Sequence, residues 1–207
     1  MGQAVEVHSY TIEEYLEFEE KSEEKHEFHN GEIFAMAGGS IAHSIIKGNA
    51  FGELRSRLNK EGAKCKAHES DLKVYIERFN SFLYPDVGVV CGDLQIPDIT
   101  KDSYTNPILI VEILSDSTAQ YDRGIKFEKY RSLPSFKEYV LVNQDVPKVE
   151  LFYQEDESLW RIQTVRGLDS TVYFRSINQE FSMADIYLDV VFPEVPQAGV
   201  EPAKSRV

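Results

Sequence analysis

The sequence predicts a mixed α/β (α+β) fold, with a mixed central β-sheet flanked by helices and preceded by an N-terminal helix and hairpin. Residues 107–114 are apolar except for Glu112, which is typical of a strand buried on both faces. Residues 40–60 carry apolar side chains at helical spacing, and residues 148–165 hold two strand-like runs around a polar turn. The order helix, hairpin, helix, strands, helix, strands predicts one sheet between helices.

The length and composition are those of an ordinary globular chain. It has 207 residues, of which 42% are hydrophobic and 28% charged. We expect a single domain over residues 1–192 and a disordered, proline-containing tail over residues 193–207. The sequence holds neither a membrane span nor a signal peptide. Cys65 and Cys91 fit neither a disulfide framework nor a zinc cluster, so we expect two small buried hydrophobes and a cytoplasmic protein.

Local signals mark the elements of the first half. Thr11 and Glu14 have the spacing of a capping box that opens a short helix. The Asn30-Gly31 pair between two strand-like runs is typical of a tight hairpin, and Ser40 is placed to cap the next helix. The remaining expected elements are strands at 65–68, 71–77, 83–91 and 107–114, a surface loop at 92–106, a helix over 122–130 that ends before Pro134, strands at 138–143, 148–153, 159–165 and 171–174, and a helical turn at 182–187.

The net charge of −13 argues against a protein that grips nucleic acid through a broadly basic surface. The charge is uneven, because residues 1–35 hold ten acids and two bases. Residues 36–75 hold seven bases and four acids, and residues 121–137 hold five bases and two acids. These basic segments are either solvated helix faces or the rim of a site on an otherwise acidic body.

Four charged residues form the candidate site. Glu112 is the one polar residue in its strand, and an ionised carboxylate in such a place needs a partner. Asp86 begins another strand, Glu27 lies in the first hairpin, and Lys126 shares a predicted helix face with Asp122 and Tyr130. Carboxylates that converge with a lysine suit Mg²⁺ (or Mn²⁺) and hydrolysis of a phosphate ester.

Each of these residues also has a structural interpretation. Asp86 follows Pro85 and could be a turn residue. Glu112 could pair with a cation of the core, and Lys126 could be a solvated helix residue beside Lys129. Glu27 competes with Glu24 and Glu32. His43 could touch a phosphate or metal, or be an ordinary satisfied histidine, and Tyr130 is expected in the core.

Four segments resemble, in order, the Uma family of the restriction-endonuclease-like PD-(D/E)XK superfamily. They are YPD at 84–86, VEILSDST at 111–118, YDRGIKFEKY at 121–130 and KEYVLVN at 137–143, and residues 26–54 match as well. The resemblance spans roughly residues 10–190. It implies a restriction endonuclease-like core, a divalent metal and hydrolysis of DNA.

Carried over by position, the resemblance implies that Asp86 and Glu112 bind the metal and that Glu27 is an accessory acid. The superfamily pattern places a lysine two residues after the second acid, where this chain has Leu114. The family resemblance implies that Lys126 from the next helix supplies the amine. The expected activity is a divalent-metal-dependent endonuclease acting on DNA as a homodimer. The alternatives are a catalytically silent nuclease-fold module that binds nucleic acid or protein, and a metal phosphoesterase acting on RNA or nucleotides.

Overall fold

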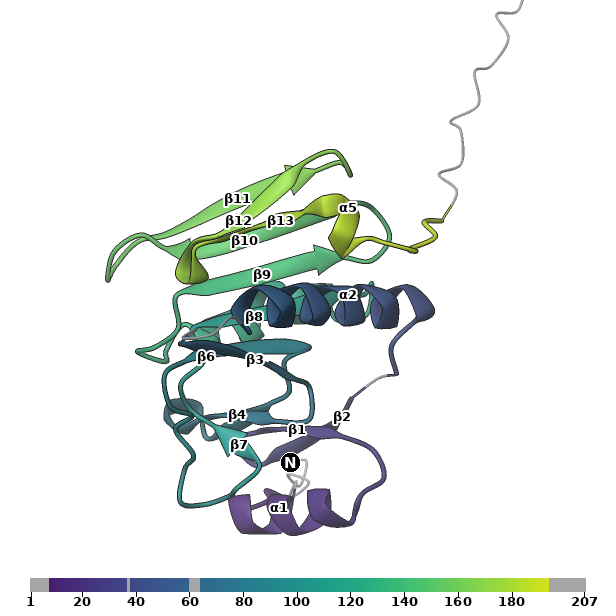
Figure 1. Cartoon of the computed structure of the whole chain (residues 1–207). Coiled ribbons are helices and arrows are strands. Elements are labelled where there is room, and N and C mark those ends of the chain that lie inside the picture. The colour runs from purple at the N-terminus through teal and green to yellow at the C-terminus, as the bar shows by residue number, and fades with distance from the viewer. Residues whose placement is uncertain (1–7, 37, 60–63, 194–207) are drawn as a thin grey trace, which may run out of the picture.

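The computed structural model describes residues 8–36, 38–59 and 64–193. The predicted mixed class is confirmed, with helices packed on mixed β-sheets (Figure 1). The helical elements are α1 (Ile12–Lys21), α2 (Ile41–Leu58), η1 (Glu77–Phe79), α3 (Ala119–Tyr121), η2 (Asp122–Lys126), α4 (Phe127–Tyr130), η3 (Arg175–Ile177) and α5 (Met183–Ile186). The strands are β1 (His26–His29), β2 (Glu32–Ala35), β3 (Cys65–Glu69), β4 (Lys73–Ile76), β5 (Ser81–Leu83), β6 (Val87–Cys91), β7 (Ser103–Tyr104), β8 (Leu109–Leu114), β9 (Glu138–Asn143), β10 (Lys148–Gln154), β11 (Trp160–Arg166), β12 (Thr171–Phe174) and β13 (Gln179–Ser182).

The strands form three sheets rather than the one that we expected. A six-stranded sheet has the order β11-β10-β9-β8-β6-β3, and only its β8–β9 pair is parallel. A five-stranded sheet has the order β2-β1-β5-β4-β7, and β12 pairs with β13. Figure 1 shows the hairpin β1–β2 and α1 at one end of the molecule and β10–β13 with α5 at the other.

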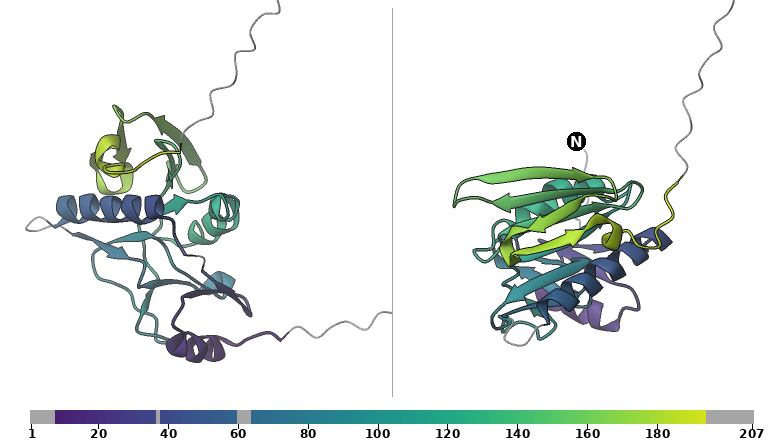
Figure 2. Two further views of the ribbon diagram at one scale, coloured as in Figure 1. Left: turned by 90° about the vertical axis from the view of Figure 1, so that its right-hand side faces the viewer. Right: turned by 45° about the horizontal axis from the view of Figure 1, so that its top comes forward.

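The two faces of the six-stranded sheet have different cover, because side chains alternate along each strand. Val111 and Ile113 of β8 pack with Ile46 and Leu54 of α2. Ile110 and Leu114 face the other way, against Tyr130 of α4 and against the five-stranded sheet. Figure 2 (left) shows α2 and the short helical segment that contains α4 on opposite sides of this sheet. Glu112 shares the alternation of Ile110 and Leu114, so it points toward the helical segment.

The N-terminal predictions are confirmed. Thr11 and Glu14 form both hydrogen bonds of the capping box. The hairpin turns at Asn30 and Gly31, whose φ angles of 48° and 101° are positive, as this type of turn requires. Ser40 caps α2 by accepting a hydrogen bond from the backbone N–H of His43.

The strand expected over residues 83–91 is two strands in two different sheets. β5 ends at Leu83, and β6 begins at Val87 in the six-stranded sheet. The segment 84–86 between them includes Pro85, which lacks a donor for a sheet ladder. An apolar run carries no signal for a change of sheet, so the sequence predicted one continuous strand.

The expected helix over 122–130 also differs in its winding. Residues Asp122–Lys126 form a π-helical turn between two short α-helical pieces. The predicted shared face of Asp122, Lys126 and Tyr130 assumed a constant α-helical period, which the π-turn interrupts. Such turns often mark functional positions, and this one contains Lys126.

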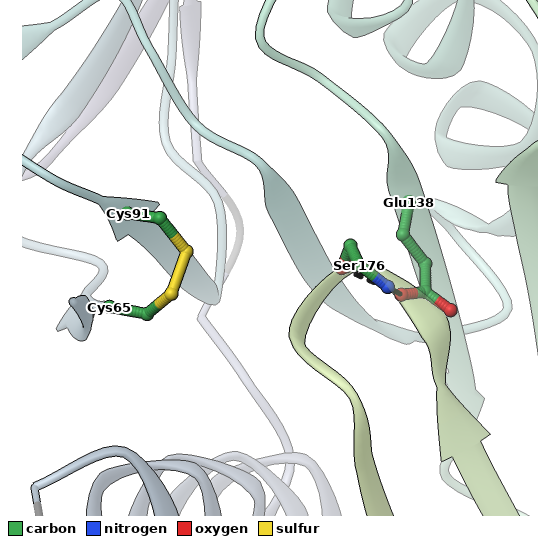
Figure 3. Close-up of a disulfide and its surroundings, with 4 residues drawn as sticks. All are labelled: Cys65, Cys91, Glu138 and Ser176. Carbon is green, nitrogen blue, oxygen red and sulfur yellow. Dashed lines mark hydrogen bonds between the residues drawn. A yellow bond between two sulfur atoms is a disulfide. The ribbon is translucent and has the colours of Figure 1, made fainter. Parts of the chain in front are cut away.

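The expectation of two unpaired cysteines was wrong. Cys65 of β3 and Cys91 of β6 lie opposite each other in the antiparallel pair and form a disulfide (Figure 3). The pairing register decides this contact, and two cysteines 26 residues apart do not reveal it. The cytoplasmic location rested in part on free thiols and stays a prediction.

The predicted division into a domain over 1–192 and a tail over 193–207 also stays a prediction, since residues 194–207 lie outside the described residues. Among the described residues, no helix has the length and apolar character needed to cross a membrane.

Candidate active site

The fold brings the four predicted site residues together from four separate elements. Lys126 Nζ lies 2.9 Å from Glu112 Oε1 and 3.3 Å from Glu27 Oε1. Asp86 is joined to the same group through its backbone N–H, which donates to Glu112 Oε2 at 3.2 Å. The second oxygen of the Asp86 carboxylate, Oδ2, accepts a hydrogen bond from the N–H of Ile113 at 2.8 Å. These residues lie far apart in the sequence, and the fold brings them together where the two larger sheets meet.

The segment that crosses between the two sheets is fixed by the site residues themselves. The N–H of Tyr84 donates to Glu27 Oε1 at 3.1 Å, and its carbonyl oxygen accepts from Lys126 Nζ at 3.1 Å. Its hydroxyl donates to Glu19 Oε1 at 2.8 Å. A crossing segment has no strand partner to satisfy its peptide groups, so these side chains satisfy them. Sequence reasoning missed Tyr84 because its backbone makes the contacts to Glu27 and Lys126.

Lys126 is surrounded by carboxylates. Besides Glu112 and Glu27, Asp122 contacts Lys126 through Oδ1 at 3.8 Å. All four side chains are nearly inaccessible to solvent. Three carboxylates around one ammonium leave an excess of negative charge at this point, and Asp86 adds to it.

The charges act on one another through their pKa values. Burial raises the pKa of Glu112 well above its usual range, and Asp86 and Asp122 add to the shift, while Lys126 opposes it. Burial alone would lower the pKa of Lys126, but Glu112, Glu27 and Asp122 outweigh it and raise the pKa. The surrounding carboxylates therefore favour the ammonium form of Lys126, whereas burial disfavours the ionised form of Glu112.

The ionised form of Glu27 is strongly stabilised by neighbouring groups. Burial acts to raise its pKa, but Lys126 and hydrogen bonds from His29 and Tyr121 prevail and lower the pKa to about 2. The hydroxyl of Tyr121 donates to Glu27 Oε2 at 2.8 Å and lies 3.0 Å from His29 Nε2. Lys129 closes this chain of contacts through His29 Nδ1 and through Ser81 Oγ, the latter at 3.1 Å. The structure thus selects Glu27 over Glu24 and Glu32 as the acid that contacts Lys126.

His43 and Tyr130 complete the surroundings. His43 Nε2 lies 3.0 Å from Asp86 Oδ1, so this histidine belongs to the site rather than to an ordinary helix surface. Tyr130 is buried as predicted, and its hydroxyl donates to Glu112 Oε1 at 3.3 Å. Tyr121 and His29 are further site residues that sequence reasoning missed. The signal for His29 was its strand alternation with Glu27, and nothing local marks Tyr121.

The site lies in an open cleft of about 990 Å³, which is lined by all four predicted residues together with His29 and His43. The expected basic rim is only partly present, because Lys47 and Lys129 line the cleft, whereas Arg57 pairs with Glu53 and Arg123 with Glu150.

The cleft offers carboxylate donors of the kind that bind a divalent cation. Across residues 8–36, 38–59 and 64–193, no group of three or more His, Cys, Asp or Glu side chains is arranged around one point as in a protein-only metal cage. Mg²⁺ does not require such a cage, because it usually takes one or two carboxylates and keeps several waters. Asp86 and Glu112 both line the cleft, and the backbone N–H of Asp86 donates to Glu112 Oε2, so their side chains belong to the same part of the site. These residues therefore fit a hard divalent cation.

Comparisons with known proteins give a matching family model, similar sequences and a similar fold. A family model described as "Uma2: Putative restriction endonuclease" matches residues 12–186. Two proteins of Synechocystis sp. (strain ATCC 27184 / PCC 6803 / Kazusa) are similar in sequence. "Uncharacterized protein slr1290" is 36% identical over 182 residues, covering 87% of this chain and 92% of that protein. "Uncharacterized protein sll1609" is 34% identical over 167 residues, covering 79% of this chain and 92% of that protein.

One solved structure shares the fold. It is a crystal structure from Anabaena variabilis ATCC 29413, described as "a putative nuclease belonging to DUF820". The TM-score is 0.69 at 16% identity, over 86% of this chain and 97% of that one. The family model covers nearly all of the described residues and includes every residue of the candidate site. The chain belongs to the Uma2 family.

Proposed function

We propose that this protein is a nuclease that hydrolyses phosphodiester bonds of DNA, with Mg²⁺ or Mn²⁺ as cofactor. The observation that carries the proposal is the position of Lys126 Nζ, 2.9 Å from Glu112 Oε1, beside an open cleft that Asp86 also lines. Family membership and the fold of the Anabaena protein support it.

Asp86 and Glu112 would hold the cation, which would polarise a phosphoryl oxygen and lower the pKa of a bound water. The N–H groups of Lys126 face Glu112, Glu27 and the carbonyl of Tyr84, so its ammonium would act by offsetting the charge that develops on the phosphate. Glu27 and the carbonyl of Tyr84 hold Lys126 in place. His43 and the N–H of Ile113 orient Asp86.

Cleavage assays test this proposal directly. Supercoiled plasmid and single-stranded circular DNA are incubated with the purified chain at low salt, with Mg²⁺ or Mn²⁺ and, in parallel, with a chelator. Low salt favours contacts to phosphate. We expect nicking or cutting that needs the metal and that falls at least about 100-fold in Glu112→Gln. Lys126→Arg keeps the charge but alters the geometry, and we expect at least about a tenfold loss.

Glu128→Gln and Lys137→Arg are matched controls, because both residues are exposed and do not line the cleft. They should cleave like the wild type. Equal activity in all five proteins, or cleavage that survives the chelator, would contradict the assignment. The same assay with an RNA substrate distinguishes a deoxyribonuclease, which should leave RNA intact, from a phosphoesterase that acts on RNA. A homodimer stays a prediction, and sedimentation would check it.

A further inference from the structure

The hairpin β1–β2 presents one face to the cleft. Glu27 pairs with Phe34 across the two antiparallel strands, and His29 pairs with Glu32. Directly opposed residues of an antiparallel pair point to the same side of the sheet. These four side chains therefore share one face, and all four line the cleft. Phe34 is thus placed beside Glu27, the acid that contacts Lys126.

Phe34 is a large aromatic side chain that remains 47% exposed at this position. Its strand β2 is an edge strand of the five-stranded sheet. The ring of His29 meets it edge-on, with ring centroids 5.0 Å apart at an interplanar angle of 61°. Ile125, which precedes Lys126 in the π-turn, also lines the cleft and is 57% exposed. The cleft therefore offers an aromatic ring and an aliphatic side chain next to the proposed reacting groups.

The cationic groups of the cleft are largely engaged by protein partners. Lys126 is held by carboxylates, Lys25 pairs with Asp71 at 2.6 Å, and Lys129 contacts His29 and Ser81. The chain as a whole carries a net charge of −13. A duplex binder that tracks two phosphate backbones relies on many free lysines and arginines. Stacking of an unpaired base on an aromatic ring needs far fewer of them.

We propose that Phe34 is a stacking platform for an unpaired nucleobase beside the scissile phosphate, so that the preferred substrate is single-stranded nucleic acid. This inference rests on the proposed nuclease function and adds the substrate class. The base stacks on Phe34, which stands opposite Glu27 on the hairpin face that lines the cleft. A duplex keeps its bases paired and stacked, so it cannot use Phe34 without local opening.

The test measures affinity for fluorescent oligonucleotides of one sequence, as a single strand and as a duplex, by anisotropy with Ca²⁺ in place of Mg²⁺. We expect the wild type to bind the single strand more tightly than the duplex. Phe34→Ala should weaken single-strand binding about tenfold and leave duplex binding unchanged. Phe34→Tyr should restore the affinity, whereas Phe34→Leu, which is apolar but has no π-face, should not.

Phe18→Ala is the matched control, because Phe18 is 42% exposed on α1 and does not line the cleft. It should bind as the wild type does. Equal or tighter binding of the duplex by the wild type, or full affinity of Phe34→Leu, would overturn the inference. Metal-dependent cleavage without any preference for the single strand would support the nuclease proposal and contradict the stacking role of Phe34. Phe34-dependent binding without cleavage would support the stacking role and contradict the nuclease proposal.

Discussion

Glu112 and Glu138 are two buried glutamates on the neighbouring parallel strands β8 and β9, with very different surroundings. Glu138 accepts hydrogen bonds from the N–H of Ser176 at 2.8 Å and from its hydroxyl at 2.7 Å (Figure 3). It also accepts one from the N–H of Arg175 at 3.1 Å. Glu112 instead contacts the ammonium of Lys126, with Asp86 as a like-charged neighbour. Glu138 does not line the cleft, whereas Glu112 does.

Burial raises the pKa of both glutamates, so a raised pKa does not distinguish them. The difference lies in how the charge is compensated. Glu138 fastens η3 to the start of β9 through neutral donors, which is a structural task. Glu112 belongs to a group in which several acids surround a single lysine beside an open cleft. The unbalanced negative charge of that group would favour binding of a cation. Four substitutions sharpen this contrast.

The largest effect is expected from Lys126→Met, which removes the ammonium and leaves Glu27, Glu112 and Asp122 without it. Uncompensated buried charge typically costs about 3–5 kcal/mol of unfolding free energy. Urea unfolding followed by circular dichroism measures this loss. Adding Glu112→Gln to Lys126→Met should recover part of it, because the two residues interact directly. The exposed Lys137→Met should stay within about 0.5 kcal/mol of wild type, and a similar value for Lys126→Met would refute the picture.

Glu27→Gln tests the electrostatics of the cluster through pH. The pKa of Glu27 is about 2 in the fold against 4.5 ordinarily, so the folded state favours the ionised form. Its contribution, roughly 3 kcal/mol, is complete above pH 4.5 and is lost as pH falls toward 2. The stability difference between wild type and Glu27→Gln should therefore fall by about half between pH 7 and pH 3. A difference independent of pH would contradict it, and exposed Glu32→Gln serves as the control.

Activity should separate the two glutamates. Glu112→Gln should lower the cleavage rate at least about 100-fold, or about 2.7 kcal/mol, because it removes a proposed metal ligand. The variant should still fold, because glutamine has nearly the shape of glutamate and burial disfavours the ionised form of Glu112. Glu138→Gln should cleave within about twofold of wild type. Comparable losses in both variants would mean that the rate reports the integrity of the fold rather than the site.

The smallest effect is expected on the stability of Glu138→Gln. One acceptor oxygen remains, but the amide NH₂ replaces the other and faces the donors of Arg175 and Ser176. An unsatisfied buried donor costs about 1–3 kcal/mol, which urea unfolding resolves. An unchanged unfolding free energy would indicate that Glu138 is already protonated in the fold and that hydrogen bonds to its second oxygen contribute little to stability.

The sequence by itself determined much of this molecule, because local chemistry is short in range. Apolar spacing, the capping box at Thr11 and the Asn30-Gly31 turn located most helices and strands. The lone carboxylate in the apolar strand of Glu112 indicated one residue of the candidate site. The family resemblance indicated Asp86, Lys126 and Glu27, and the fold brings all four together.

The tertiary structure decided the rest, because it depends on contacts between distant segments. The division of the strands into separate sheets follows from the crossing at Tyr84, whose peptide groups are satisfied by Glu27 and Lys126. The choice of Glu27 over its acidic neighbours, the Cys65–Cys91 bond and the place of Phe34 in the cleft follow from strand register. Register is set by the packing of whole faces, and no local pattern in the chain encodes which distant residue will stand opposite.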